Sequence, residues 1–213
     1  PCPMSSSTRL QFPALARRWL LACLAACPAL ALAQTTPAVS SLVAFSGSQP
    51  SSTPVRGPDG ALYGATATTN VVTGGLIYRL AADGSKIDTL YQLRIEDGYS
   101  PFGGVVLGSD GLLYGTTSIG AANEANTSGT IYRLATNGSG FTVLHRFANF
   151  TGVNANGSPI NTNGTNPDSE LVEGSDGYLY GVTRTGGPNG NGVVFKIAKD
   201  GSGFAVLHAF GPI

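Results

Sequence analysis

The sequence predicts an all-β protein made of tandem four-stranded meanders, which we interpret as three blades of an incomplete β-propeller. Glycine accounts for 30 of the 213 residues, and charged residues make up only 11%. Short runs rich in Val, Ile, Leu, Tyr and Thr are bounded by Asp-Gly or Asn-Gly, as strands joined by tight turns are. The same runs recur three times in the same order, which is the signature of a repeat architecture.

The N-terminal segment has the pattern of a secretory signal peptide. Basic residues lead into the apolar run WLLACLAACPALALA, which ends just before Gln34 and is too short to span a membrane. We therefore expect residues 1–33 to be a cleaved signal peptide. Residues 1–3 precede the only methionine, Met4, and are expected to lie upstream of the true translation start.

Two other interpretations of this segment remain open. LAAC, ending at Cys27, resembles a lipoprotein box, and Arg17-Arg18 resembles a twin-arginine signal. Ordinary cleavage is favoured because more apolar sequence follows Cys27 and the residues around the arginine pair match the twin-arginine pattern poorly. We expect the protein to be exported, to the periplasm, the extracellular space or the surface of a bacterium.

Cleavage at this site changes the chemistry available to the mature chain. It removes all three cysteines and the only tryptophan, which excludes disulfides and thiolate metal sites. It also removes three of the 12 basic residues, leaving nine against 12 acidic ones, or a net charge near −3. Such a chain is not expected to bind nucleic acid or an anionic membrane surface.

Three sequence blocks make up each repeat. SDGLLYGTTSIG, which begins at Ser109, matches SDGYLYGVTRTG and PDGALYGATATT. The second block reads LIYRL, TIYRL or VVFKI, and the third reads TLYQL, VLHRF or VLHAF. The LYG tyrosines are 51 and 66 residues apart, so insertions fall between the blocks and the blocks form the strands.

A further strand precedes the first Asp-Gly of each repeat, which gives four strands per unit with the long, variable connection after the fourth. A β-solenoid is the alternative, but its rungs are shorter and more regular. The expected units are an N-terminal segment at 34–52 and blades at 53–93, 101–147 and 167–210.

One predicted strand, Leu42–Phe45 (LVAF), resembles a fourth strand that lacks the other three. Propellers often close by pairing strands from the two termini, and three blades are too few for a ring, which usually has four to eight. We therefore expect LVAF to form half of such a clasp. Its partner is expected in further blades of the same propeller beyond Ile213, in a longer protein.

The paired segments LYGTTSIG with GTIYRLATNGSGFTVLHRF, and LYGVTRTGG with GVVFKIAKDGSGFAVLHAF, resemble the GloVer-type (choice-of-anchor) tandem repeat of bacterial secreted proteins. The resemblance covers nearly all of residues 42–210, and the first copy departs from it most. It implies a repeat architecture and export, often with a C-terminal surface anchor. It carries over no activity and no site residue.

Most carboxylates are explained by turns, since half of the 12 acidic residues directly precede glycine. These are Asp59, Asp83, Asp97, Asp110, Asp176 and Asp200. A catalytic pair would need two acids outside this role in one cleft, and the candidates are Glu96, Asp168, Glu170 and Glu173. We assign no catalytic residue from the sequence.

The two histidines, His145 and His208, occupy the same position in successive repeats. A unique active site needs unique residues, so we interpret both as structural. Each imidazole is expected to pack beside Val and Phe and to bond a neighbouring backbone group.

The segment NTNGTNPDSE is rich in oxygen donors, and calcium needs six to eight of them. Weak calcium candidates are Asn161, Asn163, Asp168 and Glu170. The segment lacks the spaced acids of an EF-hand, so we prefer a solvated loop and expect no cofactor.

Two functional hypotheses remain. In the first, the blades form a binding or scaffold module that presents its variable loops to a polysaccharide or a surface protein. Those loops are Thr68–Gly75, Ile119–Gly129 and Ala148–Pro167. In the second, the chain is a fragment of a propeller enzyme, such as a hydrolase, a lyase or a quinone-dependent dehydrogenase. The mature chain has no unrepeated His and no Ser-His-Asp arrangement that we can place, which favours binding and leaves enzymatic activity open.

Overall fold

The computed structural model describes residues 49–50, 52–68, 74–120 and 128–211. All of these lie within one compact unit of the chain, Ser41–Ile213. The expected signal peptide and the LVAF strand at 42–45 lie outside the described residues. Among the described residues, no helix has the length and apolar composition needed to cross a bilayer.

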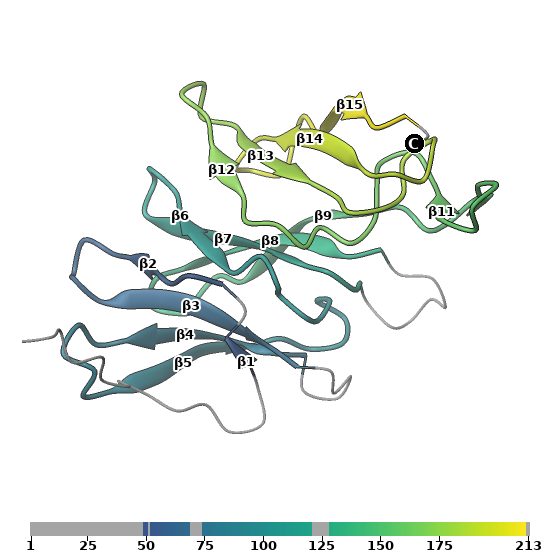
Figure 1. Ribbon diagram of the computed structural model, residues 1–213. Coiled ribbons are helices and arrows are strands. Elements are labelled where there is room, and N and C mark those ends of the chain that lie inside the picture. The colour runs from purple at the N-terminus through teal and green to yellow at the C-terminus, as the bar shows by residue number, and fades with distance from the viewer. Residues whose placement is uncertain (1–48, 51, 69–73, 121–127, 212–213) are drawn as a thin grey trace, which may run out of the picture. The chain divides into compact units, whose positions relative to one another are not determined.

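Three antiparallel sheets follow one another along the chain (Figure 1). The first contains β2 (Val55–Arg56), β3 (Leu62–Ala67), β4 (Leu76–Leu80) and β5 (Ile87–Gln92), with β1 (Gln49–Pro50) also paired to β3. The second contains β6 (Val105–Leu107), β7 (Leu112–Thr117), β8 (Thr130–Ala135) and β9 (Thr142–Arg146). The third contains β12 (Val172–Glu173), β13 (Leu179–Val182), β14 (Val193–Ile197) and β15 (Ala205–Ala209). The predicted all-β fold of tandem four-stranded meanders is confirmed.

The Asp-Gly turn between the first two strands of each sheet is fixed by the aspartate. Asp59 accepts hydrogen bonds from the backbone N–H of Ala61 at 3.1 Å and from the hydroxyl of Tyr63 at 3.0 Å. Gly60 follows with a φ of 78°, a conformation that glycine adopts without steric cost. The same contacts recur in Asp110 with Tyr114 and in Asp176 with Tyr180. The DGxLY pattern is thus one local unit in which the tyrosine of the second strand bonds back to the turn.

The glycine of each LYG motif makes room for an aromatic ring. Gly115 is the cross-strand partner of Tyr132, and the ring lies over the glycine so closely that a Cβ would come within 2.5 Å of Cζ. The other repeats contain the same pair, Gly64 with Tyr78 and Gly181 with Phe195. A glycine inside a strand commonly marks such a close approach.

Neighbouring sheets pack face to face through apolar clusters. The first cluster joins Tyr63 and Ile77 of the first sheet to Leu113 and Tyr132 of the second, all of them buried. The second cluster joins the next pair of sheets in the same way, through Tyr114, Ile131, Leu179 and Phe195. This face-to-face succession of meanders is the arrangement of propeller blades.

A stacked pair of rings also connects the two sheets at each junction. Tyr91 of β5 stacks on Phe141 with ring centroids 4.0 Å apart, and His145 of β9 stacks on Phe204 at 3.8 Å. Tyr91 and His145 are equivalent positions in the repeat, as are Phe141 and Phe204. The fourth strand of one blade therefore contacts the residue that directly precedes the fourth strand of the next blade.

The connection between the second and third sheets contains a hairpin that sequence analysis missed. Strands β10 (Gly152–Val153) and β11 (Pro159–Ile160) pair antiparallel. Their turn is closed by a bond from the N–H of Gly157 to the carbonyl of Asn154 at 2.9 Å. This hairpin lies within the Ala148–Pro167 connection, at the right of Figure 1.

Candidate functional site

The Ala148–Pro167 connection is held in place by a buried amide. Asn161 is 3% exposed, and its Nδ2 donates to the carbonyls of Ala148 at 2.8 Å and Gly164 at 2.9 Å. Its Oδ1 accepts from the backbone N–H groups of Gly164 at 2.8 Å and Gly187 at 2.9 Å. One side chain thus uses all its bonding groups to tie both ends of the hairpin segment to the β13–β14 loop.

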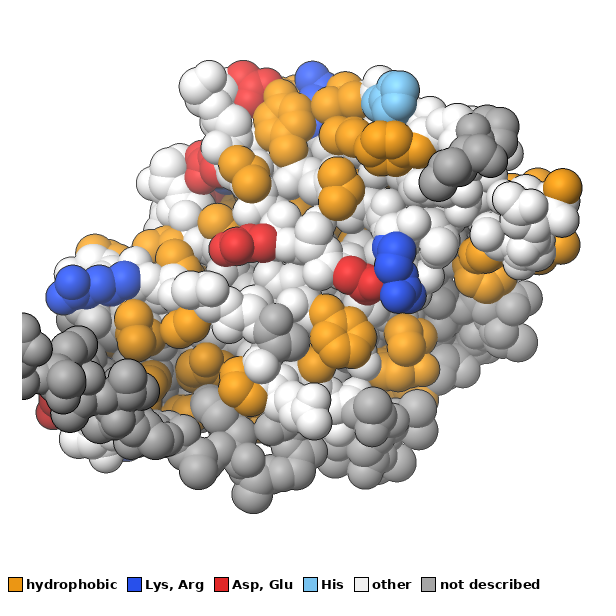
Figure 2. Space-filling view, viewed as in Figure 1, with side chains coloured by type: hydrophobic (Ala, Val, Ile, Leu, Met, Phe, Trp, Pro, Cys, Tyr) orange, Lys and Arg blue, Asp and Glu red, His pale blue; other side chains and the backbone are white. Residues whose placement is uncertain are grey.

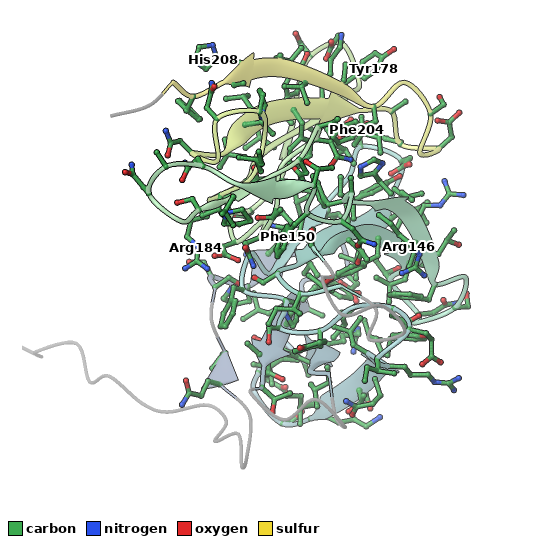
Figure 3. All side chains as sticks on the ribbon, turned by 90° about the vertical axis from the view of Figure 1, so that its right-hand side faces the viewer. Arg146, Phe150, Tyr178, Arg184, Phe204 and His208 are labelled. Atoms are coloured by element: carbon green, nitrogen blue, oxygen red, sulfur yellow. The ribbon has the colours of Figure 1, made fainter. Side chains whose placement is uncertain are left out.

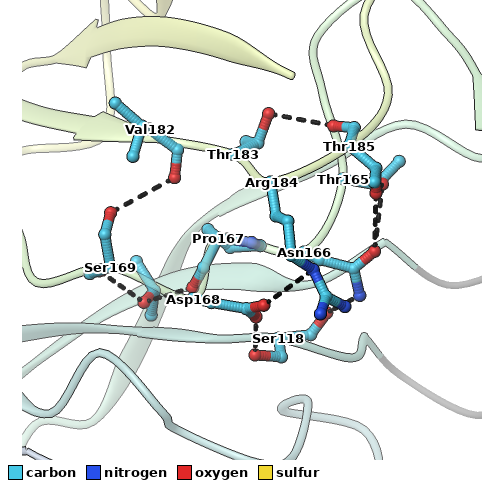
Figure 4. Close-up of polar contacts among 11 residues, drawn as sticks. Ser118, Thr165, Asn166, Pro167, Asp168, Ser169, Val182, Thr183, Arg184 and Thr185 are labelled. Atoms are coloured by element: carbon cyan, nitrogen blue, oxygen red, sulfur yellow. Dashed lines mark hydrogen bonds and ion pairs between the residues drawn. The ribbon is translucent and has the colours of Figure 1, made fainter. Parts of the chain in front are cut away.

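A second group of polar contacts lies where this connection enters the third sheet (Figure 4). Ser118, which follows β7, donates its hydroxyl proton to Asp168, and the Arg184 Nε lies 3.1 Å from the other carboxylate oxygen. Arg184 follows β13 and is 68% exposed at its side chain. Both carboxylate oxygens of Asp168 therefore have partners within the protein.

Asn166 joins this group to the second sheet. Its Nδ2 donates to the carbonyl of Ser118 at 3.0 Å, and its Oδ1 accepts from Thr185 at 3.0 Å. The Asn166 backbone has a φ of 54°, which is uncommon for a residue other than glycine. Its N–H donates to the carbonyl of Ser128 at 3.1 Å. This hydrogen bond connects the Ala148–Pro167 segment to the second blade.

The four carboxylate candidates have separate sets of partners. Glu96 is exposed and lies 3.8 Å from Arg94, in the connection between the first and second sheets. Asp168 belongs to the Ser118–Arg184 group, and Glu170 is exposed beside it in the chain. Glu173 lies on β12 and bonds the Asp-Gly turn of the second sheet. The structure does not bring two of these acids together around a shared contact.

Glu173 takes part in a contact between the second and third blades. Its carboxylate accepts from the backbone N–H of Ser109 at 2.7 Å and from the Ser109 hydroxyl at 2.6 Å, and it pairs with Lys199. Hydrogen bonds from Lys199 and then Ser109 lower the pKa of Glu173 from 4.5 to about 2. The folded state therefore favours the ionised form of Glu173.

We expect Glu173→Gln to destabilise the fold by about 1 kcal/mol at pH 7, because charge-assisted bonds are lost and Lys199 is left without its closest partner. The contribution of Glu173 is present above pH 4.5 and is lost as the pH falls through about 2. Urea denaturation at pH 7 and pH 2.5 measures it. The difference in stability between the two proteins should be much smaller at the lower pH, and an unchanged difference would contradict the assignment.

The calcium candidates do not form a cage of free oxygens. The Oδ1 of Asn161 accepts two backbone N–H groups, and the Oδ1 of Asn163 accepts the N–H of Ala148 at 2.8 Å. Asp168 is bonded to Ser118 and Arg184, as described above. Among the described residues, no group of three or more His, Cys, Asp or Glu is placed to hold a metal ion.

His145 is part of the second junction, whereas His208 is exposed. The imidazole of His145 stacks on Phe204 and meets Phe147 edge-on, and the Asn163 Nδ2 lies 3.2 Å from its Nε2. Its polar partner is thus a side-chain amide rather than the expected backbone group. Burial lowers the pKa of His145 to about 4, so the ring is neutral at pH 7.

We expect this burial to make the fold sensitive to acid. In the unfolded chain His145 becomes protonated below pH 6.5, whereas in the folded protein it stays neutral until about pH 4. The free energy of unfolding therefore falls as the pH decreases through this window. The expected loss is about 1–2 kcal/mol, allowing for partial exposure of the ring. His145→Tyr, which copies Tyr91 of the first repeat, should remove this component. Denaturant titrations at pH 7, 5.5 and 4.5 test it, and parallel pH profiles for the two proteins would contradict it.

A cavity of about 450 Å³ opens at the first junction. It is lined by the ion pair of Asp59 with Arg79, at 2.7 Å, and by Thr136 and Asn137 of the second blade. Lys199 occupies the position equivalent to Thr136 at the second junction, where it reaches Ser109 and Glu173. The cavity therefore marks a place where a shorter side chain replaces lysine in the repeat.

The family model described as the Gloeobacter/Verrucomicrobia repeat matches residues 30–213. The chain belongs to this repeat family. The resemblance to GloVer-type repeats that the sequence predicted is therefore confirmed. No curated protein matches the chain.

Several solved structures resemble this member of the Gloeobacter/Verrucomicrobia repeat family. A chain of a nidogen/laminin complex is 18% identical with a TM-score of 0.45, and the match covers 71% of this chain and 44% of that one. A gluconolactonase from Xanthomonas campestris is 17% identical with a TM-score of 0.42, covering 79% and 50%. An oxidoreductase from Thermus thermophilus, described as a glucose dehydrogenase, is 15% identical with a TM-score of 0.42, covering 73% and 45%. The chain spans about half the length of each of these structures or less.

Proposed function

We propose that this repeat protein is exported and acts as a binding module, with the Ala148–Pro167 connection as its contact surface and a neutral polysaccharide as its ligand. The supporting observation is that the connection is held in one conformation by the buried Asn161 amide. A loop that is already ordered loses little conformational entropy when it binds. Binding residues are often found on loops that a rigid scaffold positions.

The composition of the connection favours a neutral, hydroxyl-rich ligand. Residues 148–167 contain six asparagines and no Asp, Glu, Lys or Arg. Amide side chains both donate and accept hydrogen bonds, which suits sugar hydroxyls. Phe150, labelled in Figure 3, adds a half-buried ring on which a sugar face can pack.

A glycan array probed with the full chain tests the ligand class. We expect neutral polysaccharides among the hits, and we expect Phe150→Ala and Asn156→Ala to weaken binding about tenfold each, as the loss of about 1.4 kcal/mol does. Lys86→Ala is the matched control, since Lys86 is 71% exposed in the β4–β5 turn at the other end of the strands. A blank array, or equal loss in the control, would overturn the proposal; binding to a surface protein alone would replace the polysaccharide.

Export is tested separately. Expression of the full chain in a bacterium should yield a product outside the cytoplasm whose N-terminal residue is Gln34. N-terminal sequencing of the periplasmic and extracellular fractions measures this. Recovery of the uncleaved chain in the cytoplasm alone would contradict it.

A further inference from the structure

The cavity of about 450 Å³ at the first junction lies between groups whose equivalents bond directly at the second junction. There, Arg133 Nη1 donates to the carbonyl of Lys199 at 3.1 Å, and the Lys199 ammonium donates to the Ser109 hydroxyl at 2.7 Å. The same ammonium pairs with Glu173 and lies 4.0 Å from the carboxylate of Asp110. One lysine thus connects the second and third blades at the level of the Asp-Gly turns.

The first junction lacks this lysine. Thr136 stands at the position of Lys199, and it lines the cavity together with Asn137. The arginine on the opposite side, Arg79, bonds Asp59 of its own blade, with Nη2 2.7 Å from Oδ2. The cavity is therefore the space that a lysine and an arginine bridge in the next repeat.

The groups around the cavity have an excess of negative charge. Two carboxylates line it, those of Asp59 and Asp88, against one guanidinium, that of Arg79. On the face drawn in Figure 2 charged side chains are few and lie singly or in small groups, so three around one cavity are a local concentration. At the second junction the carboxylates also outnumber the guanidinium, and the Lys199 ammonium lies among them.

The second carboxylate comes from a different strand at each junction. At the second junction it is Glu173 of β12, whose counterpart in the second blade is Leu107. At the first junction it is Asp88 of β5, the cross-strand partner of Arg79. Leu90, two residues further along β5, gives the cavity an apolar wall on which an alkyl chain can pack.

Other polar groups at this junction leave Asp88 available to a ligand. Lys86 pairs with Asp88 Oδ1 at 2.7 Å, but its side chain is 71% exposed and does not line the cavity. Exposed pairs of this kind contribute little to stability. Pro58 replaces the serine that bonds Lys199 at the second junction, and hydroxyls of Thr89 and Thr136 line the cavity instead.

We propose that this cavity binds a primary ammonium group carried on an unbranched alkyl chain, with the ammonium beside Asp59 and Asp88 and the alkyl chain along Leu90. The ligand takes the place that the Lys199 side chain takes at the second junction. Hydrogen bonds between ionised groups are stronger than neutral ones, so an ammonium binds better than a hydroxyl of the same shape. A free alkylamine and a lysine side chain of another protein share this chemistry.

Titration of the full chain with n-pentylamine, followed by the chemical shifts of backbone amides, tests the proposal. We expect saturable shifts at Thr89 and Asn137 with a Kd of about 1 mM, as for a short ligand held by one charged group. n-Pentanol has the same alkyl chain without the charge and should bind at least about tenfold more weakly. Absence of saturable shifts with the amine, or equal binding of the alcohol, would overturn the proposal.

A second probe distinguishes the two sources of the ammonium. Nα-acetyl-lysine methylamide presents the lysine side chain as it occurs within a protein. Its binding to the same amides would support the proposal and assign the site to a lysine of a partner protein. Binding of n-pentylamine alone would support the proposal and assign the site to a free amine. The site lies at the first junction, so either result is independent of polysaccharide binding at the Ala148–Pro167 connection.

Two variants connect the binding to the cavity. Asp88→Asn should weaken n-pentylamine binding about tenfold. Asp83→Asn is the matched control, since it removes the same charge from the β4–β5 turn, outside the cavity. Thr136→Lys restores the lysine of the second junction and should abolish binding, with circular dichroism as the check that the protein remains folded. Unchanged binding in Asp88→Asn, or an equal loss in the control, would overturn the proposal.

Discussion

Replacing Gly115 by alanine is expected to destabilise the protein by about 3 kcal/mol, which for a chain of this length lowers Tm by about 6–12 °C. The added methyl group would meet the ring of Tyr132, at 2.5 Å from Cζ, and the carbonyl of Gly104 at 2.7 Å. Tyr132 is fully buried in the first junction and has no room to withdraw. The strain therefore falls on both the second sheet and its contact with the first.

Gly152→Ala is the matched control for this prediction. Gly152 also lies in a strand, but a Cβ there would meet only Ile160 at 3.6 Å, an ordinary contact. Thermal unfolding followed by circular dichroism should show a large drop in Tm for Gly115→Ala and a shift of about 2 °C or less for the control. Equal Tm values for the two variants would show that the ring does not depend on the glycine.

The sequence was sufficient for the features that depend on neighbours along the chain. The Asp-Gly turns, the strand runs and their threefold recurrence are local patterns, and the predicted meanders are present in all three sheets. The turn role of Asp59, Asp110 and Asp176 was also foreseen, because an Asx side chain bonds its own backbone two residues on. What was missing was the bond to the tyrosine four residues later.

Contacts between sheets could not be read from the sequence, because they depend on the register of two strands and on which face meets the neighbour. Tyr91 and Phe141 stack across the first junction although they are 50 positions apart in the chain. The Arg184–Asp168 pair was missed for a related reason: the two residues lie on different connections and meet only when the chain is folded. Neither Arg184 nor Asp168 recurs in the other repeats, so the repeat pattern did not predict this ion pair.

The β10–β11 hairpin was missed although a local signal existed. Asn156-Gly157 lies between two short apolar pairs, and such a dipeptide favours a tight turn. Strands of two residues are too short to show alternation, so the segment was predicted to be a variable connection. Its ordering comes from Asn161, whose importance is visible only from its burial and its four partners.

Asn161→Ala is expected to destabilise the fold by about 3 kcal/mol and to loosen the hairpin that we propose as the contact surface. The substitution removes four hydrogen bonds and leaves the N–H groups of Gly164 and Gly187 and two carbonyls without this partner in a buried setting. Unsatisfied groups cost more than the bonds are worth on average. Thermal unfolding and amide hydrogen exchange at the two glycines measure the effect.

Asn156→Ala is the control, because it removes an exposed amide from the same connection and leaves the buried amide of Asn161 in place. Asn156 is exposed in the hairpin turn, so its removal should leave Tm and the exchange rates of Gly164 and Gly187 nearly unchanged. If the proposed function is correct, both variants should weaken polysaccharide binding. Only Asn161→Ala should also accelerate amide hydrogen exchange at Gly164 and Gly187. An unchanged Tm, or slow exchange at both glycines in Asn161→Ala, would show that the connection does not depend on the bonds of Asn161.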